Sequence, residues 1–505
     1  MSSSDALSNN GDSSLPTVKV GILVSAIGIG IFMSTLDATI VVIILEKIKS
    51  FYEVTSNRVQ WVILAYLLVM MAFTVIAGDL GDKFSNKLIF QIGMAVFALG
   101  SMFCFLASRP GLILSNSFWW LVLGRAIQAF GATGMVANGM ALITCFTTKK
   151  NRGTAVGINN LLISISVVIG PVLGAVISDS ILNWGGVFII NVPLGIIGFI
   201  WVQFAIPATP PCAGEQKTDY VGSILLSLFL TTLILSFTIF VDIDIESAKL
   251  WAGISLLCSI IIFPLFIFWE KRVENPIVDL GMLKNKKISI GLFTAIMKHQ
   301  GYIVIIYHIN LYLQEMGIVE NILQVGLIIA GLPVGMALMA AFAGKLSNTI
   351  DARILCTVAA AGVAVLLLLL AIFLDIQTPI WFYVFTAFTI GLSIGLFMSP
   401  NANSIMSAAP KEKLGVASSL HGLTTSIGIN LGIALSTLVF TLSGNILSKS
   451  NGQPAENPIN YVPAMQWMFG VFAIILAITA VISYFRGKED RTVSQPTLEP
   501  ELKTI

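Results

Sequence analysis

The chain repeats one pattern from end to end: apolar stretches that, at about 20 residues each, are long enough to cross the ~30 Å hydrocarbon core of a bilayer as helices. Charged residues make up only 11% of the chain, less than half of the ~25% usual in soluble domains. A membrane β-barrel would instead show short segments of alternating polarity. The sequence therefore predicts an all-α membrane protein.

Fourteen transmembrane helices are predicted from these stretches. They cover residues 20–45, 59–78, 88–107, 118–142, 154–178, 187–206, 221–241, 250–269, 288–313, 321–344, 354–374, 381–399, 414–442 and 465–485. Residues 1–17 and 487–505 are polar, and we expect them to be disordered cytoplasmic tails. The first of them lacks the basic start and cleavage site of a signal peptide.

The predicted spans fall into three blocks. Residues 18–206 are expected to form an N-terminal six-helix bundle, residues 207–287 a linker with two extra transmembrane helices, and residues 288–486 a C-terminal six-helix bundle. An insert of two helices preserves the orientation of every later span. Two six-helix bundles that face each other across a cavity are typical of transporters.

The basic residues predict the orientation. If the N-terminus is cytoplasmic, most of the 28 lysines and arginines fall in cytoplasmic loops, so both termini are predicted to be cytoplasmic in a cell (inner or plasma) membrane. The net charge of +2 then reflects topology, and no nucleic-acid partner is expected. The five cysteines show no metal or disulfide spacing, and we expect no metal and no cofactor.

Two buried charges are the strongest functional candidates. Asp37 is the only carboxylate well inside a predicted span, and Arg125 is the only arginine placed in the same way. Each lies ~11–12 Å from the outer end of its span at 1.5 Å per residue, so the two can meet if their spans are neighbours. A carboxylate poised between burial and a guanidinium can take up and release a proton. We interpret the pair as the proton-coupling site; the alternative is a static ion pair that only fixes packing.

Two further segments are candidates for conformational roles. A gating loop is predicted just after the second span, formed by Gly78, Asp79, Asp82 and Lys83. The alternative is a tight turn whose charges only reflect the membrane topology. In the fifth span, small residues surround a proline, which allows close helix packing and a bend. These residues, Gly157, Gly170, Pro171 and Gly174, are predicted to form a hinge; ordinary small-residue packing is the alternative.

Lys298 and His299 lie ~15 Å from the inner end of the ninth span, near the bilayer midplane where transporter sites are found. They are predicted to contact substrate or to form a second titrating site. The alternatives are a kinked span whose charges reach a water-filled cavity, and a displaced span boundary.

The motifs together resemble the major facilitator superfamily, and within it the fourteen-span drug:proton antiporters of the EmrB/QacA type. They are Leu36-Asp37-Ala38-Thr39-Ile40-Val41, Leu121-x3-Arg125-x2-Gln128-x2-Gly131-Ala132, Gly157-x8-Ser166-x3-Gly170-Pro171-x2-Gly174-Ala175 and Trp184-x3-Phe188-x2-Asn191-x-Pro193-x-Gly195. The third is similar to the antiporter motif of exporters and is the most specific. The chain departs from the family at Lys83 and Gly185, where arginine is usual.

The resemblance implies proton-coupled efflux of small amphipathic molecules, multidrug or siderophore/metabolite export, by alternating access. Gln128 belongs to the motif associated with proton translocation, and we group it with Lys298 and His299 in the predicted substrate cavity. The expected partners are a small-molecule substrate, protons and the lipid bilayer. A monomer is expected, and efflux partners in the periplasm or outer membrane remain an open option.

A proton-coupled uptake symporter for a small organic solute is the main rival, and the exporter-like motif of the fifth span disfavours it. A membrane enzyme would need a reactive constellation of side chains, and the spans contain no paired carboxylates, metal-ligand cluster or Ser/His/Asp set. A receptor or structural membrane protein is the remaining alternative. The identity of the substrate does not follow from the sequence.

Overall fold

The computed structural model describes residues 19–147, 149–207, 219–240, 247–273, 276–410, 414–451 and 457–487. This part of the chain is helical throughout, and it contains no β-strand. Fourteen of its helices are long and apolar enough to cross a membrane, as the sequence predicted. The chain is therefore a multi-pass membrane protein.

Among the described residues, nine α-helices precede the predicted linker. They are α1 (Val20–Ile43), α2 (Leu45–Tyr52), α3 (Ser56–Val59), α4 (Trp61–Lys83), α5 (Asn86–Ala107), α6 (Phe118–Phe146), α7 (Lys149–Ser178), α8 (Gly186–Ile189) and α9 (Asn191–Ala205). A 3₁₀ helix, η1 (Ile113–Asn116), joins α5 to α6. We call these elements the N-terminal set.

The two extra spans are α10 (Tyr220–Phe240) and α11 (Ala248–Glu270). The C-terminal set follows and consists of η2 (Met282–Lys284), α12 (Lys286–Glu315), α13 (Ile322–Thr349), α14 (Ala352–Phe373), α15 (Ile380–Ala408), α16 (Leu414–Asn451) and α17 (Pro458–Tyr484). Several helices begin at a polar N-cap whose side chain accepts a hydrogen bond from a backbone N–H, which satisfies a group that the helix itself leaves unpaired. These caps include Ser85, Asn285, Asn321 and Asp351.

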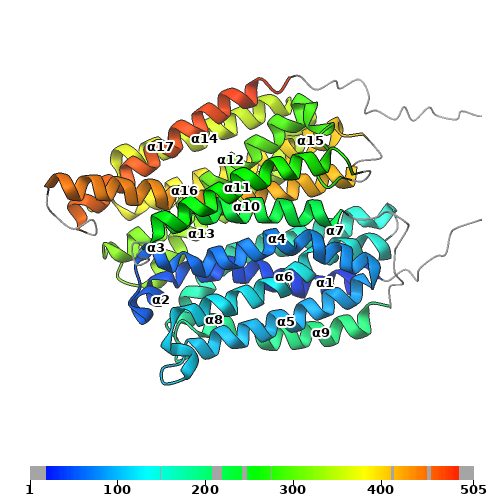
Figure 1. Ribbon diagram of the computed structural model, residues 1–505, viewed down its shortest axis with the longest axis horizontal. Helices are drawn as coiled ribbons and strands as arrows, with labels where there is room; N and C mark the ends of the chain where they lie inside the picture. Colours follow the sequence, from blue (N-terminus) through cyan, green and yellow to red (C-terminus); the bar gives the residue numbers. More distant parts are fainter. Residues whose placement is uncertain are drawn as a thin grey trace, which may run out of the picture.

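Helices pack mainly within their own set (Figure 1). In the N-terminal set α1 packs on α6, α7 and α9, and α5 packs on α6 and α9. In the C-terminal set α13 packs on α15, α14 on α17, and α12 on α16. The sets meet where α7 crosses α13 and where α1 meets α12. The hairpin of α10 and α11 runs across the middle of the view, and α10 contacts both α4 and α16.

The start of α1 and the end of α17 lie at the same end of the helical bundle (Figure 1). We call this the near end, and the opposite end, which holds α2 and α3, the far end. Because eight spans precede α12, this helix also starts at the near end and ends at the far end with Glu315.

Two segments differ from the sequence prediction. Helix α4 continues through Lys83, so the four predicted gating residues lie in the last turns of a helix and not in a loop. A basic residue in the last turn is favourable because the helix dipole is negative there. The side chains of Asp79 and Asp82 lie outside the described part of the structure, as do the predicted tails apart from Gly487.

Candidate functional site

Asp37 of α1 and Arg125 of α6 form the ion pair that their matched depth predicted. A carboxylate oxygen of Asp37 bonds the guanidinium Nη1 of Arg125. The side chains are 0% and 1% exposed, so neither charge is solvated by water. Two charges in such surroundings cost several kcal/mol each unless they pair and their remaining polar atoms are satisfied.

The remaining contacts of Asp37 come from neutral donors. Its Oδ1 accepts from Gln128 Nε2 at 2.8 Å and from Asn191 Nδ2 at 2.9 Å. Gln128 Nε2 also donates to Ser101 Oγ at 2.7 Å. In each of these hydrogen bonds the carboxylate is the acceptor. The contacts of Asp37 and Gln128 join four helices: α1, α5, α6 and α9.

Arg125 is held on its other sides as well. Its Nε donates to the backbone carbonyl of Val62 at 3.0 Å, and its Nη1 also donates to Gln128 Oε1 at 2.5 Å. The guanidinium carbon lies 4.3 Å from the ring centre of Tyr66, a cation–π distance. The Tyr66 hydroxyl donates to the Ser34 carbonyl at 3.3 Å. The guanidinium is therefore fixed even where Asp37 does not touch it.

Sequence reasoning gave no role to Asn191, Ser101 or Tyr66. Asn191 is in a motif that resembles the family, and both Asn191 and Tyr66 are polar groups inside or at the start of an apolar span. That polarity was an available signal. Ser101 carried no signal, because serine is common in membrane helices and often bonds its own backbone.

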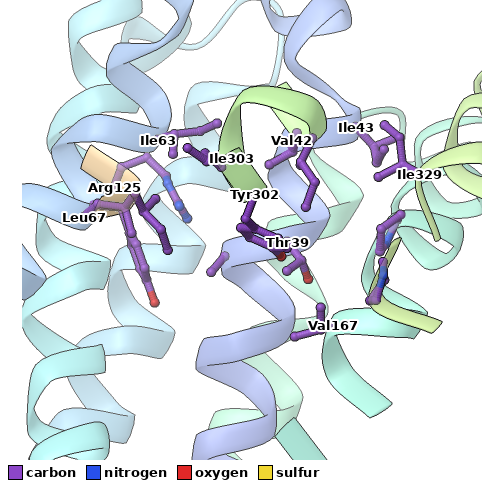
Figure 2. Close-up of a pocket in the computed structure, with 16 residues that line it drawn as sticks. Thr39, Val42, Ile43, Ile63, Leu67, Arg125, Val167, Tyr302, Ile303 and Ile329 are labelled. Atoms are coloured by element: carbon purple, nitrogen blue, oxygen red, sulfur yellow. The ribbon is translucent and has the colours of Figure 1, made fainter. Parts of the chain in front are cut away.

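A cavity of about 90 Å³ lies between the two helix sets (Figure 2). Its walls come from α1, α4, α6 and α7 on one side and from α12, α13 and α16 on the other. Most lining side chains are aliphatic, and the polar ones are Thr39, Tyr66, Arg125 and Tyr302. The Asp37–Arg125 pair therefore lies at the cavity wall: Arg125 lines the cavity, and Asp37 lies behind it.

The predicted hinge packs tightly on α1. A Cβ added to Gly170 would collide with Thr39 Oγ1, and one added to Gly174 would lie 2.9 Å from the backbone oxygen of Ile40. On the other side of α7, the carbonyl of Pro171 lies 2.7 Å from the position of a Cβ on Gly326 in α13. Helix α7 is thus held between α1 and the C-terminal set. Gly157 is also in α7, but its surroundings lie outside the described part.

Lys298 and His299 do not line this cavity, and neither does Gln128, which is bound to Asp37. The two basic residues are in α12, one turn before the lining residue Tyr302. Lys298 Nζ lies 2.9 Å from His299 Nε2 and 5.9 Å from the ring centre of Phe397.

A second buried arginine, Arg486, lies just beyond the last predicted span. It is 2% exposed because the end of α17 packs into the C-terminal set. Its Nη2 donates to Thr294 at 2.9 Å and to Asn401 at 2.5 Å, and Nη1 contacts the sulfur of Cys356 at 3.7 Å.

Polar contacts tie the two sets together at the far end. Lys49 Nζ of α2 lies 2.5 Å from Glu315 Oε1 of α12, and Ser56 Oγ donates to the same oxygen at 2.6 Å. We call Lys49, Ser56 and Glu315 the far-end latch. Asn310 of α12 donates to the Val42 carbonyl at 2.6 Å. The two sets are therefore in direct polar contact on the far side of the cavity.

Known proteins similar to this chain include a riboflavin transporter and an antibiotic resistance protein. The riboflavin transporter RibZ of Clostridioides difficile (strain 630) is 28% identical over 478 residues, which cover 94% of this chain and 99% of RibZ. The methylenomycin A resistance protein of Bacillus subtilis (strain 168) is 25% identical over 449 residues, 86% of this chain and 91% of that relative.

A solved D-xylose–proton symporter has a TM-score of 0.64 over 92% of this chain and 97% of its own, at 11% identity, so that likeness concerns the fold alone. The sequence model of the Major Facilitator Superfamily matches residues 27–433. The chain therefore belongs to the Major Facilitator Superfamily, as its motifs predicted, and it is a transporter and not an enzyme.

Proposed function

We propose that the protein exports small amphipathic molecules in exchange for protons. The observation that carries this proposal is the buried Asp37–Arg125 pair behind the wall of a cavity shared by both helix sets. A titratable carboxylate at membrane depth is costly and is usually retained for a task. Here it is one side chain away from the space in which cargo would bind.

Protonation of Asp37 would remove the negative partner of Arg125 and leave an acid that must donate as well as accept. Two of its present neighbours, Gln128 and Asn191, donate amide N–H groups to Asp37, so the network would have to rearrange. Thr39 and Ile40, two and three residues further along α1, are the contacts of Gly170 and Gly174. A change at Asp37 would thus reach the α1–α7 packing within one helical turn.

The near end is the cytoplasmic end in this proposal, because the basic residues favour that side. The far-end latch then seals the outer face, and the conformation is closed to the outside. Drug-sized ligands occupy pockets of about 300–1,000 Å³, well above the cavity found here. Cargo would enter only when the near end opens, as alternating access requires.

The lining favours amphipathic cargo. Aliphatic walls would bind the apolar part, and Thr39, Tyr66, Tyr302 and Arg125 offer hydrogen bonds and one positive charge. Lys298 and His299, one turn away, would bias the site towards neutral, zwitterionic or anionic groups. The names of two relatives, a riboflavin transporter and an antibiotic resistance protein, agree with cargo of this kind.

Uptake by proton symport is the rival, and it differs in direction. Inside-out membrane vesicles energised to be acidic inside can be offered riboflavin, an anionic dye and a cationic dye. Export by antiport predicts accumulation of at least one probe, and its loss when a protonophore collapses the gradient. Accumulation only in right-side-out vesicles that are acidic outside would instead support symport.

A further inference from the structure

The hairpin of α10 and α11 carries two buried acids that the proposed transport cycle does not use. Asp219 precedes α10 and is 6% exposed, and Glu270 ends α11 and is 3% exposed. Each has one oxygen without a hydrogen-bond partner: Oδ2 of Asp219 and Oε1 of Glu270. A buried polar atom without a partner costs about 1–3 kcal/mol, and more when it is charged.

The two unpartnered oxygens lie near each other beside Gly222. Both lie within 2.8 Å of the point where a Cβ on Gly222 would stand, so they are no more than twice that distance apart. Their other oxygens are already engaged. Asp219 Oδ1 accepts from Trp269 Nε1 at 2.7 Å and from the Gly222 backbone N–H at 2.8 Å, and Glu270 Oε2 accepts from the Val278 backbone N–H at 3.3 Å.

We propose that Asp219 and Glu270 form a proton-binding site, in which Glu270 Oε1–H donates to Asp219 Oδ2. One proton, taken from water, gives both unpartnered oxygens a partner and removes one of two buried negative charges. Helix geometry assigns the proton to Glu270. Asp219 is at the positive N-terminus of α10, which favours its anion, whereas Glu270 is at the negative C-terminus of α11.

A metal ion fits the site less well. Hard cations take about six or more oxygen ligands, and among the residues that the structure describes only two carboxylate oxygens without a partner lie at this site. Within the described residues, no group of three or more His, Cys, Asp or Glu side chains is arranged to hold a metal. The proton needs no further ligand.

The charged groups around the pair come from three directions. Asp279, after Val278, uses Oδ1 to cap Gly281 N at 2.8 Å. Lys83 of α4 bonds the Tyr220 hydroxyl and lies 4.1 Å from its ring centre. Just after α11, Arg272 stacks on Phe268 at 3.9 Å, and Lys271 is exposed.

The apolar residues Ala417 and Leu420 of α16 pack in the cluster that also contains Val278 and residues of α10 and α11. The site therefore joins the hairpin to the segment that leads into α12, and the Lys83–Tyr220 contact joins it to α4. Loss of the proton would leave two repelling carboxylates at this joint and loosen it.

The folded protein then binds a proton that the unfolded chain releases at neutral pH, so its stability must fall as pH rises. We would purify the full chain in nanodiscs and follow Tm from about pH 5 to about pH 9. Glu270→Gln, whose amide donates the same hydrogen bond without titrating, is expected to lose most of the wild-type fall in Tm. Glu320→Gln, at an exposed acid between α12 and α13, is the control and is expected to keep it.

Infrared spectroscopy supplies a readout that a structural role alone would not change. The wild type at neutral pH should show a protonated-carboxyl C=O band that disappears at alkaline pH and is absent from Glu270→Gln. If Glu270→Gln does not fold, Asp219→Asn serves, because it also removes the shared proton. Identical bands and Tm profiles in variant and wild type would overturn the proposal. So would recovery of the alkaline Tm by Na⁺ or Mg²⁺, which would identify a cation site.

Discussion

The N-terminal and C-terminal sets share an architecture but treat buried cations differently. In the N-terminal set the guanidinium of Arg125 faces the carboxylate of Asp37. In the C-terminal set Lys298 and Arg486 are buried among neutral groups, with no ion pair to either among the described residues. The compensated pair is suited to gain and lose a proton, whereas the uncompensated cations are suited to attract or to position negative groups.

This difference gives each set a separate task in the proposed cycle. Titration of Asp37 acts inside the N-terminal set and reaches α7 through Thr39 and Ile40. The C-terminal set contacts α7 through α13, which packs on Pro171, so a movement of α7 would reach it there. In the proposed cycle the same set also supplies the charge that selects cargo. The comparison is open to test by variants that should affect one set and spare the other.

Removal of the two buried guanidiniums should have unequal effects on stability. Arg125→Ala leaves the Asp37 carboxylate buried without its counter-charge, and breaking a buried pair in this way costs about 3–5 kcal/mol. Arg486→Ala removes only bonds to neutral groups such as Thr294 and Asn401, which are worth about 1–3 kcal/mol. The Tm of the purified variants measures both. A larger fall in Arg486→Ala than in Arg125→Ala would contradict the comparison.

Gly174→Leu should prevent α7 from moving relative to α1. The new side chain would meet the Ile40 backbone, and overpacking costs about 1–3 kcal/mol, enough to trap one conformer whose gap to the other is a few kcal/mol. Cysteine labelling at the two cavity mouths, after replacement of the five native cysteines, should become one-sided. Gly253→Leu is the control, since that glycine has open space around it. Equal labelling at both mouths in Gly174→Leu would rule out a moving seal.

The sequence predicts the position of a side chain along its helix better than its direction around the helix axis. Depth along a helix is predictable because each residue adds 1.5 Å, and Asp37 and Arg125 do meet as their matched depth implied. The direction in which a side chain points around the helix axis is not predictable in this way, because apolar residues occur on every face of these helices and mark no single buried face. That is why Lys298 and His299 were assigned to the cavity, whereas Tyr302, one turn further on, lines it.

Helix ends were the second weak point. Hydropathy places the end of a span where charge begins, but helix α4 continues through its charged residues to Lys83, and the side chain of Arg486, just after α17, is buried. Donors such as Ser101 and Asn191 were missed because their partner is in another span, and a single sequence carries no record of that contact. The small-residue pattern of α7, in contrast, predicted its close packing correctly, because Gly170 and Gly174 act through size alone.

Loosening the far-end latch should shift the balance of conformers. Lys49→Ala removes a charged hydrogen bond between the sets, worth about 1–3 kcal/mol and so roughly 5- to 150-fold in population. Lys47→Ala is a matched control on the same helix, because Lys47 pairs with Asp179 inside the N-terminal set. Far-mouth cysteine labelling should rise in the first variant only. Equal labelling in both would mean that the latch does not hold the far end closed.

Lys298→Ala should have the smallest effect, and a selective one. If the C-terminal cations select cargo, this variant loses transport of an anionic dye by several-fold and spares a cationic dye, because charge acts strongly where water screening is low. Lys298→Arg keeps the charge and should keep the preference. A uniform loss for dyes of every charge would assign Lys298 to folding or conformational change.

The most direct test of the coupling role of Asp37 separates proton-driven transport from exchange. In proteoliposomes, wild type and Asp37→Asn can be compared with the probe that the wild type accumulates in vesicles. The asparagine keeps the shape of the site and an oxygen for Arg125, but it cannot titrate. We predict that the variant still exchanges labelled for unlabelled probe and no longer responds to a proton gradient, while Asp179→Asn at an exposed carboxylate behaves as wild type. Gradient-driven accumulation at the wild-type rate in Asp37→Asn would contradict the account.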